Sequence, residues 1–431
     1  MEQVLKSSLK RSNRREPLGF AYFGLVLFMV EYYLHPDWWI PGLAVVPLVK
    51  ITSILILLAL IFSISNIRWH IPREVIFLGL LMVQLWLAVI FSPVWRGGAF
   101  KVMIDFSKVL PLVIVIYLAV RSMKRLRWIL FVQAGSVAAI AIASVVNAHL
   151  PGGRLQGVLS GMYGNSNDFA LLMDISFPLC LALALTTRNS WEKVIWTIAM
   201  LGMIYAVFLT ASRAGAISLV VVAVVCLWQL GVKSRRFYLL LLVPVAVIVI
   251  WLYSANALRA RFEQTDISPV TANHSTEASG SAQQRKELLI QSLKVTAQHP
   301  LFGVGPGNFV ILSGVWHVTH NSYTQLSSEG GIPALLLYAL IFWRAITNLR
   351  DVRKYPKAGK AIRIFSMALE ASLAAYLVGS FFATDAYQVF PYCLVAYTSA
   401  LFLIVRKERR GLNLASEIRR TPAPVEVPVW Q

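Results

Sequence analysis

Long runs of apolar residues constrain this chain more than any other feature of its sequence. A helix needs about 20 residues to cross the hydrocarbon core of a bilayer, and in lipid its backbone polar groups must bond to one another. The chain is 57% hydrophobic and 14% charged, whereas soluble proteins carry about 25% charged residues. We therefore expect an all-α polytopic membrane protein with about 12 transmembrane helices. The expected spans are 18–35, 42–64, 74–92, 101–120, 128–147, 167–187, 194–210, 214–231, 237–253, 332–349, 362–384 and 386–405.

The basic residues are divided unevenly between the two sides that this pattern defines. An even number of spans places both termini on one side, and the connections on that side hold 29 of the 40 Lys and Arg residues. The opposite side holds 9 of them. The positive-inside rule therefore predicts cytoplasmic termini. Because topology accounts for the net charge of +20, we expect membrane lipids as partners and no nucleic acid.

The same pattern divides the chain into five segments. A basic cytoplasmic tail covers 1–17, and membrane helices 1 to 9 cover 18–253. An outer-face loop covers 254–331, and membrane helices 10 to 12 cover 332–405. The remaining residues, 406–431, end in a Pro-rich stretch and are expected to form a disordered cytoplasmic tail.

The outer-face loop contains a helical pattern of its own. Leu289, Leu293 and Ala297 recur at helical spacing within 284–299, with polar and basic residues opposite. This pattern predicts an amphipathic helix on or near the membrane surface, ended by Pro300. A long loop with its own helix is uncommon as a passive connection, so a lid or the wall of a site is favoured.

Polar residues that precede the sixth span form the first candidate site. Arg154 lies in a Gly-rich outer loop, and Asn167 and Asp168 follow at the head of the span. Backbone amides and one guanidinium bind anions, with Asn167 in a supporting role. A simple turn before a capped helix is an equally good interpretation, and for Asp168 the helix cap is favoured.

Two further arginines are candidates at the outer face. Arg213 stands in an otherwise apolar hairpin among small residues, which leave room for its guanidinium to face a cavity. The alternative is a side chain that extends to lipid headgroups. Arg285 begins the amphipathic helix, and on its own it would be read as a headgroup contact.

A polar segment, "HVTHNSYTQLSSEGG", leads into the tenth span. His320 directly precedes Asn321, and a neutral imidazole there can accept a proton from a hydroxyl. Ser322 could cap the helix that follows. Asn321 and Glu329 are candidate supporting residues, and His317 is expected to be an interfacial neighbour. The alternative is two interfacial histidines and a helix cap.

Other kinds of site find little support. Asp105 and Lys108 are three residues apart within the fourth span, which favours a structural ion pair over a proton relay. The sequence contains no P-loop and no zinc-type His/Glu spacing. The three cysteines all lie in apolar runs, which argues against disulfides. We therefore expect no metal and no cofactor.

Four elements in order resemble the O-antigen ligase and polymerase superfamily of bacterial membrane glycosyltransferases, over roughly residues 100–400. They are "GRLQGVLSGMYGNSNDFA", "TASRAGAISL", "QQRKELLIQSLKVTAQHPLFGVGPGNF" and "HNSYTQLSSEGGIPALLLY". Each alone is a weak indication, but four in this order and topology are a strong one.

The resemblance implies a GT-C-like fold and a function. Family members bind the diphosphate of a polyprenyl-linked glycan through arginines that match Arg154, Arg213 and Arg285, and a histidine that matches His320 is their base. The implied reaction moves a glycan from undecaprenyl diphosphate to a sugar hydroxyl, without metal and with inversion. The implied location is the periplasmic side of the bacterial inner membrane. A ligase would use lipid A core as acceptor, and a polymerase would use a growing lipid-linked glycan.

Two other classes of function compete with this interpretation. A transporter or flippase of lipid-linked sugars would use Asp105, Lys108 and the outer arginines as a path. Such folds often contain internal repeats, and no convincing repeat is present. A scaffold of the cell envelope would tolerate replacement of the outer arginines.

Overall fold

The computed structural model of the chain is helical, with no strand among the residues that it describes. Eight of its helices are long and apolar enough to cross a membrane, and three shorter apolar helices accompany them. Together they correspond to every predicted span except 237–253, which lies outside the described residues. The described residues are 18–40, 42–63, 71–150, 153–159, 161–232, 275–356 and 358–420.

The apolar helices that match the predicted spans follow one another along the chain. They are α2 (Gly19–Leu34), α4 (Leu48–Ser63), α5 (Arg73–Ile90), α6 (Arg96–Ser107) continued by α7 (Val109–Ala119), α8 (Met123–Val146), α9 (Ser166–Thr186), α10 (Ser190–Leu209), α11 (Arg213–Cys226), α16 (Ser322–Arg353), α17 (Lys360–Gly379) and α18 (Phe390–Arg420). The other helical elements are α3 (Pro36–Trp39), η1 (Leu43–Val45), η4 (Gly161–Tyr163), η5 (Leu227–Val232), α14 (Ser275–Gln298) and α15 (Phe309–Leu312).

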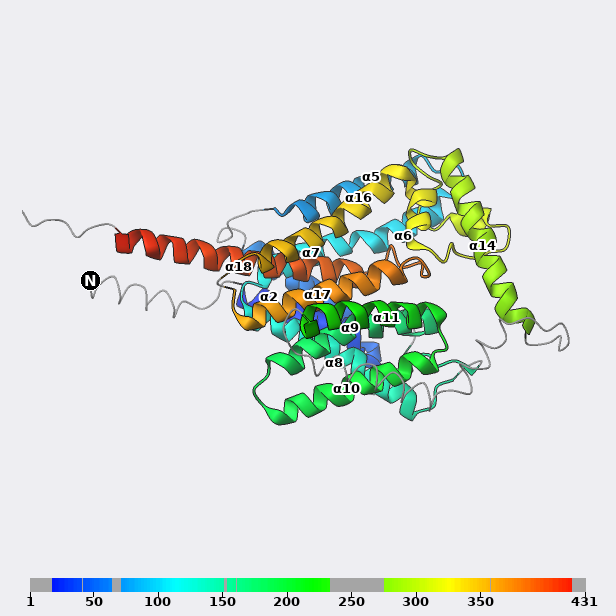
Figure 1. The fold of residues 1–431 in the computed structure, drawn as a ribbon. Coiled ribbons are helices and arrows are strands. Elements are labelled where there is room, and N and C mark those ends of the chain that lie inside the picture. Colours follow the sequence, from blue (N-terminus) through cyan, green and yellow to red (C-terminus); the bar gives the residue numbers. More distant parts are fainter. Residues whose placement is uncertain are drawn as a thin grey trace, which may run out of the picture.

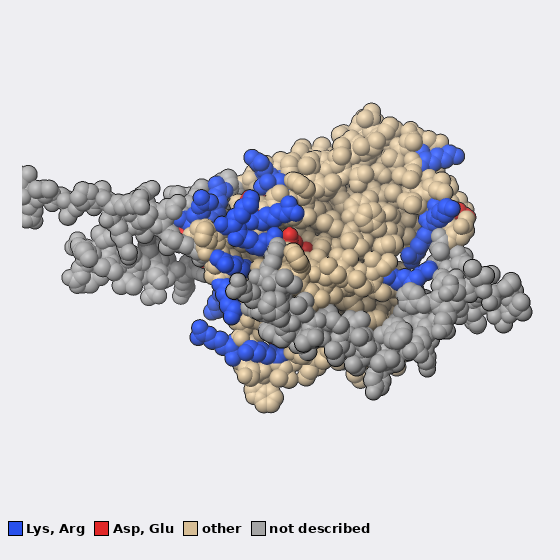
Figure 2. All heavy atoms as spheres, viewed as in Figure 1, with Lys and Arg blue, Asp and Glu red and all other residues tan. Residues whose placement is uncertain are grey.

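The spanning helices lie side by side, and α14 crosses one end of the bundle at a steep angle to them (Figure 1). Helix α9 is central, since it packs against α8, α10, α11 and α17, while α16 packs against α5, α17 and α18. Lys and Arg gather at the end opposite α14 (Figure 2). We call the two ends the α14 end and the basic end. Their contrast agrees with the uneven charge distribution read from the sequence.

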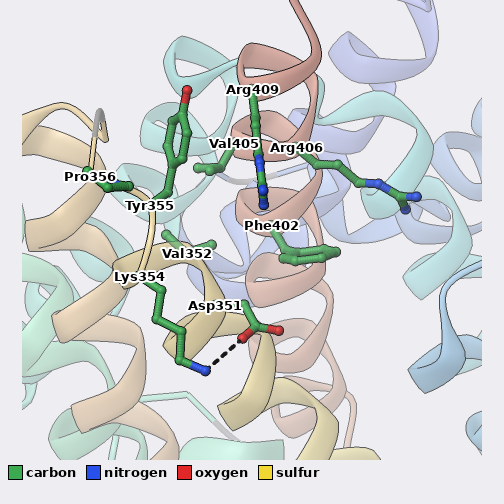
Figure 3. Close-up of a pocket in the computed structure, with 9 residues that line it drawn as sticks. All are labelled: Asp351, Val352, Lys354, Tyr355, Pro356, Phe402, Val405, Arg406 and Arg409. Carbon is green, nitrogen blue, oxygen red and sulfur yellow. Dashed lines mark hydrogen bonds and ion pairs between the residues drawn. The ribbon is translucent and has the colours of Figure 1, made fainter. Parts of the chain in front are cut away.

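A hollow of about 540 Å³ lies at the basic end, between the last turn of α16 and α18 (Figure 3). Lys354 pairs there with Asp351 at 3.4 Å. None of the predicted site residues lines this hollow. Its lining residues are Asp351, Val352, Lys354, Tyr355, Pro356, Phe402, Val405, Arg406 and Arg409.

Two helices extend beyond the spans that hydropathy predicts. Helix α16 begins at Ser322, well before the predicted start at 332, and bends at Gly331. Helix α18 continues to Arg420, so residues 406–420 are helical where a disordered tail was expected. The extension is rich in Arg and also contains Glu and Leu, which favour helix even without an apolar face.

The charged residues within the fourth span are paired, as expected. Lys108 Nζ lies 2.6 Å from Asp105 Oδ1, and both side chains are exposed on the surface of the bundle. The span itself is divided at Lys108 into α6 and α7.

Residues 300–309, which we call the glycine clasp, bind the bent part of α16. The bend leaves backbone groups of α16 without partners in their own helix, and the clasp supplies partners from the same chain. The backbone bonds run from Val304 N to Ser328 O (2.9 Å), from Gly305 N to Glu329 O (2.9 Å) and from Ile332 N to Pro300 O (2.8 Å).

Glycine is required at this contact because the two backbones touch. Gly303 and Gly331 both have positive φ, at 64° and 81°. A Cβ on Gly303 would lie 2.4 Å from the carbonyl carbon of Glu329, and a Cβ on Gly331 would lie 2.4 Å from Leu301 O. The glycine run thus allows the close approach that the bend needs.

The clasp also holds α14 in place across the end of the bundle. Leu288 and Val295 of α14 pack in one buried cluster with Val304 and Phe309 of the clasp. The hydroxyls of Thr296 and Ser327 are 2.9 Å apart and join α14 directly to α16.

The buried face of α14 differs from the face that the sequence suggests. The predicted helix is present, but Leu289 and Leu293 are 38% and 53% exposed, whereas Leu288 and Val295 are buried. The helix has apolar residues on two sides, and contact with the clasp selects the side that is buried.

We expect the close contact at Gly303 to dominate the stability of this end. Gly303→Ala should destabilise the protein more than Gly314→Ala, because both glycines have positive φ but a Cβ on Gly314 meets nothing within 4 Å. Backbone strain costs about 1 kcal/mol in either variant, and overpacking adds about 1–3 kcal/mol at Gly303. Thermal unfolding in detergent measures the difference, and equal shifts in Tm would contradict the account of the clasp.

Candidate functional site

Helices α9, α11 and α16 all begin at the α14 end, and a side chain caps each of them. Asn165 accepts from the amide of Asn167, Ser212 from that of Gly215, and Asn321 from the amides of Tyr323 and Thr324. The N-terminus of a helix carries partial positive charge and attracts anions. The fold therefore turns three such termini toward the same end of the bundle.

These caps correct two expectations. Asn165 caps α9 in place of Asp168, which lies in the first turn. Asn321 caps α16 in place of Ser322, whose hydroxyl donates to Ala383 O at 2.8 Å. In both places neighbouring residues are equally able to cap, and tertiary contacts decide which one does.

Arg154 and Asn167 lie together, as the sequence suggested, and they hold a turn. The Nε of Arg154 donates to Thr210 O, and its terminal nitrogen donates to Asn167 Oδ1, both at 2.9 Å. The hydroxyl of Ser212 donates to the same Asn167 oxygen at 2.8 Å. These bonds tie the loop of Arg154 and the head of α9 to the turn that precedes Arg213.

Arg213 is the first residue of α11, and its side chain is exposed. The preceding turn contains Ala211 in the left-handed region, with φ of 48°. A Cβ on Gly215 would lie 2.5 Å from the Cβ of Ala170, so glycine lets α11 pack directly on α9. The small residues around Arg213 thus fix its position at the head of the helix.

Arg285 extends from α14 toward the same region. Burial and then the nearby charge of Arg213 lower the pKa of the Arg285 guanidinium. Two like charges are thus held near each other. Among the residues that the structure describes, neither arginine has a carboxylate within ion-pair distance.

His320 lies beside Arg285, immediately before the cap of α16. Burial, followed by the charges of Arg285 and His317, lowers the pKa of its imidazole to about 4. His320 is therefore neutral at pH 7 and can accept a proton. Its backbone has φ of 51°, a region that few residues other than glycine adopt and one often found at functional sites.

Glu329 lies buried at the contact between α16 and the glycine clasp. Its carboxyl group lies in the clasp, near the backbone amides of Gly307 and Phe309 and the side chains of Gln325 and Tyr387. It is only 3% exposed. Glu329 therefore joins α16 to the clasp, and Asn321 supports His320 as the helix cap that follows it.

Asp385 lies against the start of α16 and is not among the residues that the sequence predicts for the site. It lies between α17 and α18, is 2% exposed, and its amide donates to the Ser322 hydroxyl at 2.9 Å. Its Oδ2 has no hydrogen-bond partner among the described residues. Burial and then the neighbouring Asp168 raise the pKa of the Asp385 carboxyl. The sequence gives one indication of this position, because the predicted topology places Asp385 and His320 on the same side of the membrane.

These contacts form a closed chain at the α14 end. Hydrogen bonds join α9 to the turn before α11. Arg213 lies near enough to Arg285, and Arg285 near enough to His320, for their charges to interact. Ser322, which follows His320 by two residues, accepts a hydrogen bond from the amide of Asp385. The Asp385 carboxyl in turn lies near Asp168 of α9. We call Arg213, Arg285 and His320 the cation–histidine cluster. It combines two positive charges with a neutral base, so it can bind an anion and accept a proton.

No group of three or more His, Cys, Asp or Glu side chains suited to a metal occurs in the described part of the chain. The positive charge of the cluster comes from side chains and helix termini.

Residues 198–339 match the protein family described as O-antigen ligase. The match confirms the resemblance that the four sequence elements indicate. It includes Arg213, Arg285, His320 and Glu329, whereas Arg154, Asn167 and Asp385 lie outside it.

Other comparisons add little. No curated protein matches the chain. A solved structure described as "Structural coordination of polymerization and crosslinking by a peptidoglycan synthase complex" contains a chain 16% identical to this one. The alignment covers 78% of this chain and 97% of that chain, with a TM-score of 0.43. A likeness this weak carries no conclusion about function.

The low pKa of His320 gives a direct test of the cluster. In Arg285→Ala the imidazole loses a nearby positive charge, so its pKa should rise from about 4 toward the ordinary value of about 6.5. Burial is the larger cause and remains, so the rise should be partial. Arg285→Lys retains the charge and should change the pKa little. NMR of labelled histidines, assigned with His320→Gln, measures both, and an unchanged value in Arg285→Ala would show that the two residues are not neighbours.

Proposed function

We propose that this protein is a glycosyltransferase of the O-antigen ligase type that uses undecaprenyl-diphosphate-linked glycan as donor. It transfers the glycan to a sugar hydroxyl of lipid A core at the periplasmic face of the bacterial inner membrane. The cation–histidine cluster carries the proposal, because it combines two guanidinium groups with a neutral imidazole at a membrane boundary. The family match over the cluster supports the same reaction class.

In the proposed reaction the acceptor oxygen attacks the anomeric carbon of the first donor sugar. The bond between that carbon and the phosphate oxygen breaks, and the electron pair leaves with undecaprenyl diphosphate. His320 takes the proton of the acceptor hydroxyl. Attack from the face opposite the leaving group inverts the anomeric configuration.

Arg213 and Arg285 stabilise the charge that develops on the leaving diphosphate. A guanidinium offers a planar pair of donors that suits phosphate oxygens. Fixed cations of this kind act before the bond breaks and need no reorganisation. Arg154 uses donors on Thr210 and Asn167, so we assign it the role of positioning the turn that presents Arg213.

The electrostatics of the site suit this order of events. In the free protein, burial and then the neighbouring cations keep the pKa of His320 at about 4, which makes it a weak base. A bound diphosphate would offset the charge of Arg213 and Arg285, and the pKa of His320 would rise. Donor binding would thus strengthen the base when it is needed.

A transfer assay with purified protein tests the roles. His320→Ala should lower kcat by at least about 100-fold, as loss of a general base does, and Arg213→Ala and Arg285→Ala should also reduce transfer strongly. Lys286→Ala removes an exposed charge beside Arg285 and is the matched control, with activity near wild type. EDTA should have no effect. Full transfer by His320→Ala would refute the assignment of the base.

The products of the same assay separate the competing functions. Glycan on lipid A core indicates a ligase, and longer chains on the lipid-linked donor indicate a polymerase. Both release free undecaprenyl diphosphate. Movement of intact lipid-linked glycan across the membrane without this release would identify a transporter instead.

Asp385 should act as a neutral acid. Asp385→Asn keeps a neutral donor of similar size and should retain activity within about 3-fold, whereas Asp385→Ala leaves a cavity beside Ser322 and should lose at least about tenfold. Measurement of kcat for the two variants, with thermal stability as control, tests this. If Asp385→Asn loses as much as Asp385→Ala, the site requires the ionised carboxylate.

A further inference from the structure

The hollow at the basic end takes its two walls from two different helices (Figure 3). On α18 the lining residues recur at helical spacing and so form one face of the helix. They are Phe402, Val405, Arg406 and Arg409. The last turn of α16 and the residues that follow it form the other wall. The volume of about 540 Å³ is of a size that holds small organic groups. None of the lining residues has a role in the proposed function.

The hollow lies where the bundle is expected to leave the membrane. The predicted spans end at residue 349 on α16 and at residue 405 on α18. Phe402 and Val405 precede this boundary, whereas Arg406 and Arg409 follow it. The wall on α18 therefore offers apolar surface toward the membrane interior and cationic groups toward the aqueous side. The positive-inside rule predicts that this side is cytoplasmic.

Positive charge exceeds negative charge among the residues that line the hollow. Lys354, Arg406 and Arg409 are basic, and Asp351 is the one acid among the lining residues. Lys354 pairs with Asp351, but the two side chains are 78% and 50% exposed, and such an exposed pair contributes little. In the described part of the chain, Arg409 has no carboxylate within ion-pair distance. The excess of cations suits a phosphate group.

The two arginines of α18 point in different directions (Figure 3). Arg409 extends back along the helix in the direction of Phe402, as long side chains on helices commonly do. Arg406 points away from α16, and its charge reaches Tyr117 of α7. Arg409 and Lys354 are therefore the cations best placed to bind one ligand between α18 and α16.

We propose that this hollow binds an anionic phospholipid of the surrounding leaflet. Its phosphate lies between Arg409 and Lys354, and the upper part of an acyl chain lies against Phe402 and Val405. A soluble phosphate would leave the apolar part of the wall without a partner, and a zwitterionic lipid would bring an ammonium group toward the two cations. Basic pockets between membrane helices on the cytoplasmic side recognise anionic headgroups in this way.

The bound lipid would join the end of α16 to α18 at the boundary of the membrane. The cation–histidine cluster lies at the opposite end of the bundle. The inference therefore does not depend on the proposed function, and either can fail without the other.

Lipid titration of the purified full-length protein tests the site. Native mass spectrometry measures the binding of phosphatidylglycerol, with phosphatidylethanolamine as the zwitterionic comparison. Wild type should bind phosphatidylglycerol more tightly. Lys354→Ala combined with Arg409→Ala should weaken that binding by about tenfold or more, because each cation near an anionic headgroup contributes several-fold to affinity. Binding of phosphatidylethanolamine should change little.

A matched control removes two charges from the same two helices outside the hollow. Arg350→Ala combined with Lys407→Ala replaces one exposed cation on α16 and one on α18, and neither lines the hollow. This variant should keep the wild-type affinity for phosphatidylglycerol. The lipid should also raise the Tm of wild type and of the control, but not that of the Lys354 and Arg409 variant. Each shift is measured from the same protein without lipid, so a change in basal stability does not affect the comparison.

Three outcomes overturn the proposal. Equal losses of affinity in the two double variants would mean that the lipid responds to the overall charge of the basic end. Equal binding of the two lipids by wild type would mean that the hollow does not select an anionic headgroup. If inorganic phosphate raises the Tm as much as phosphatidylglycerol does at the same concentration, the hollow binds a phosphate anion and not a lipid.

Discussion

The bend of α16 and the glycine clasp that binds it are the contact on which the α14 end depends. A bend exposes backbone amides and carbonyls, which is costly near a membrane unless the chain supplies partners. Residues 300–309 supply them and approach closely because their glycines carry no Cβ. The clasp also buries one side of α14. The same contact therefore orients both the helix that carries Arg285 and the helix whose cap follows His320.

The charge arrangement that follows from this geometry is unfavourable in the free protein. Arg213 and Arg285 are held near each other, and burial adds to the cost for Arg285. The left-handed backbone of His320 adds local strain. Such costs are tolerated when rigid structure around them determines the conformation, and here the caps, the clasp and the Arg154 bonds do so. An anion bound between the arginines would relieve the repulsion, so the free energy of binding has a source in the geometry of the unoccupied protein.

Much of the fold could be predicted from the sequence because lipid imposes a strict local rule. Runs of apolar residues become helices, and basic residues mark one side, so the spans and the contrast between the two ends follow from the pattern. The details that depend on tertiary contact were harder. Asn165 and not Asp168 caps α9, since several neighbouring residues meet the local requirement. Leu288 and not Leu289 is buried, since α14 has two apolar sides. Asp385 could not be predicted because only the tertiary packing of its loop brings it to Ser322 at the start of α16.

The structure also divides residues that a motif presents as equals. Arg154 and Glu329 have the residue types expected of binding groups. Arg154, however, donates to Thr210 and Asn167, and Glu329 lies against amides of the clasp. Arg213 and Arg285 instead lack carboxylate partners in the described part of the chain, and repel each other. A sequence motif includes the residues that contact a ligand and also the residues that hold those residues in place. Hydrogen-bond partners separate the two, because a side chain whose donors are used within the protein has fewer to offer a substrate. By this criterion the groups that we propose to contact the substrate lie on α11, on α14 and just before α16, while the residues that hold them are distributed over the surrounding loops.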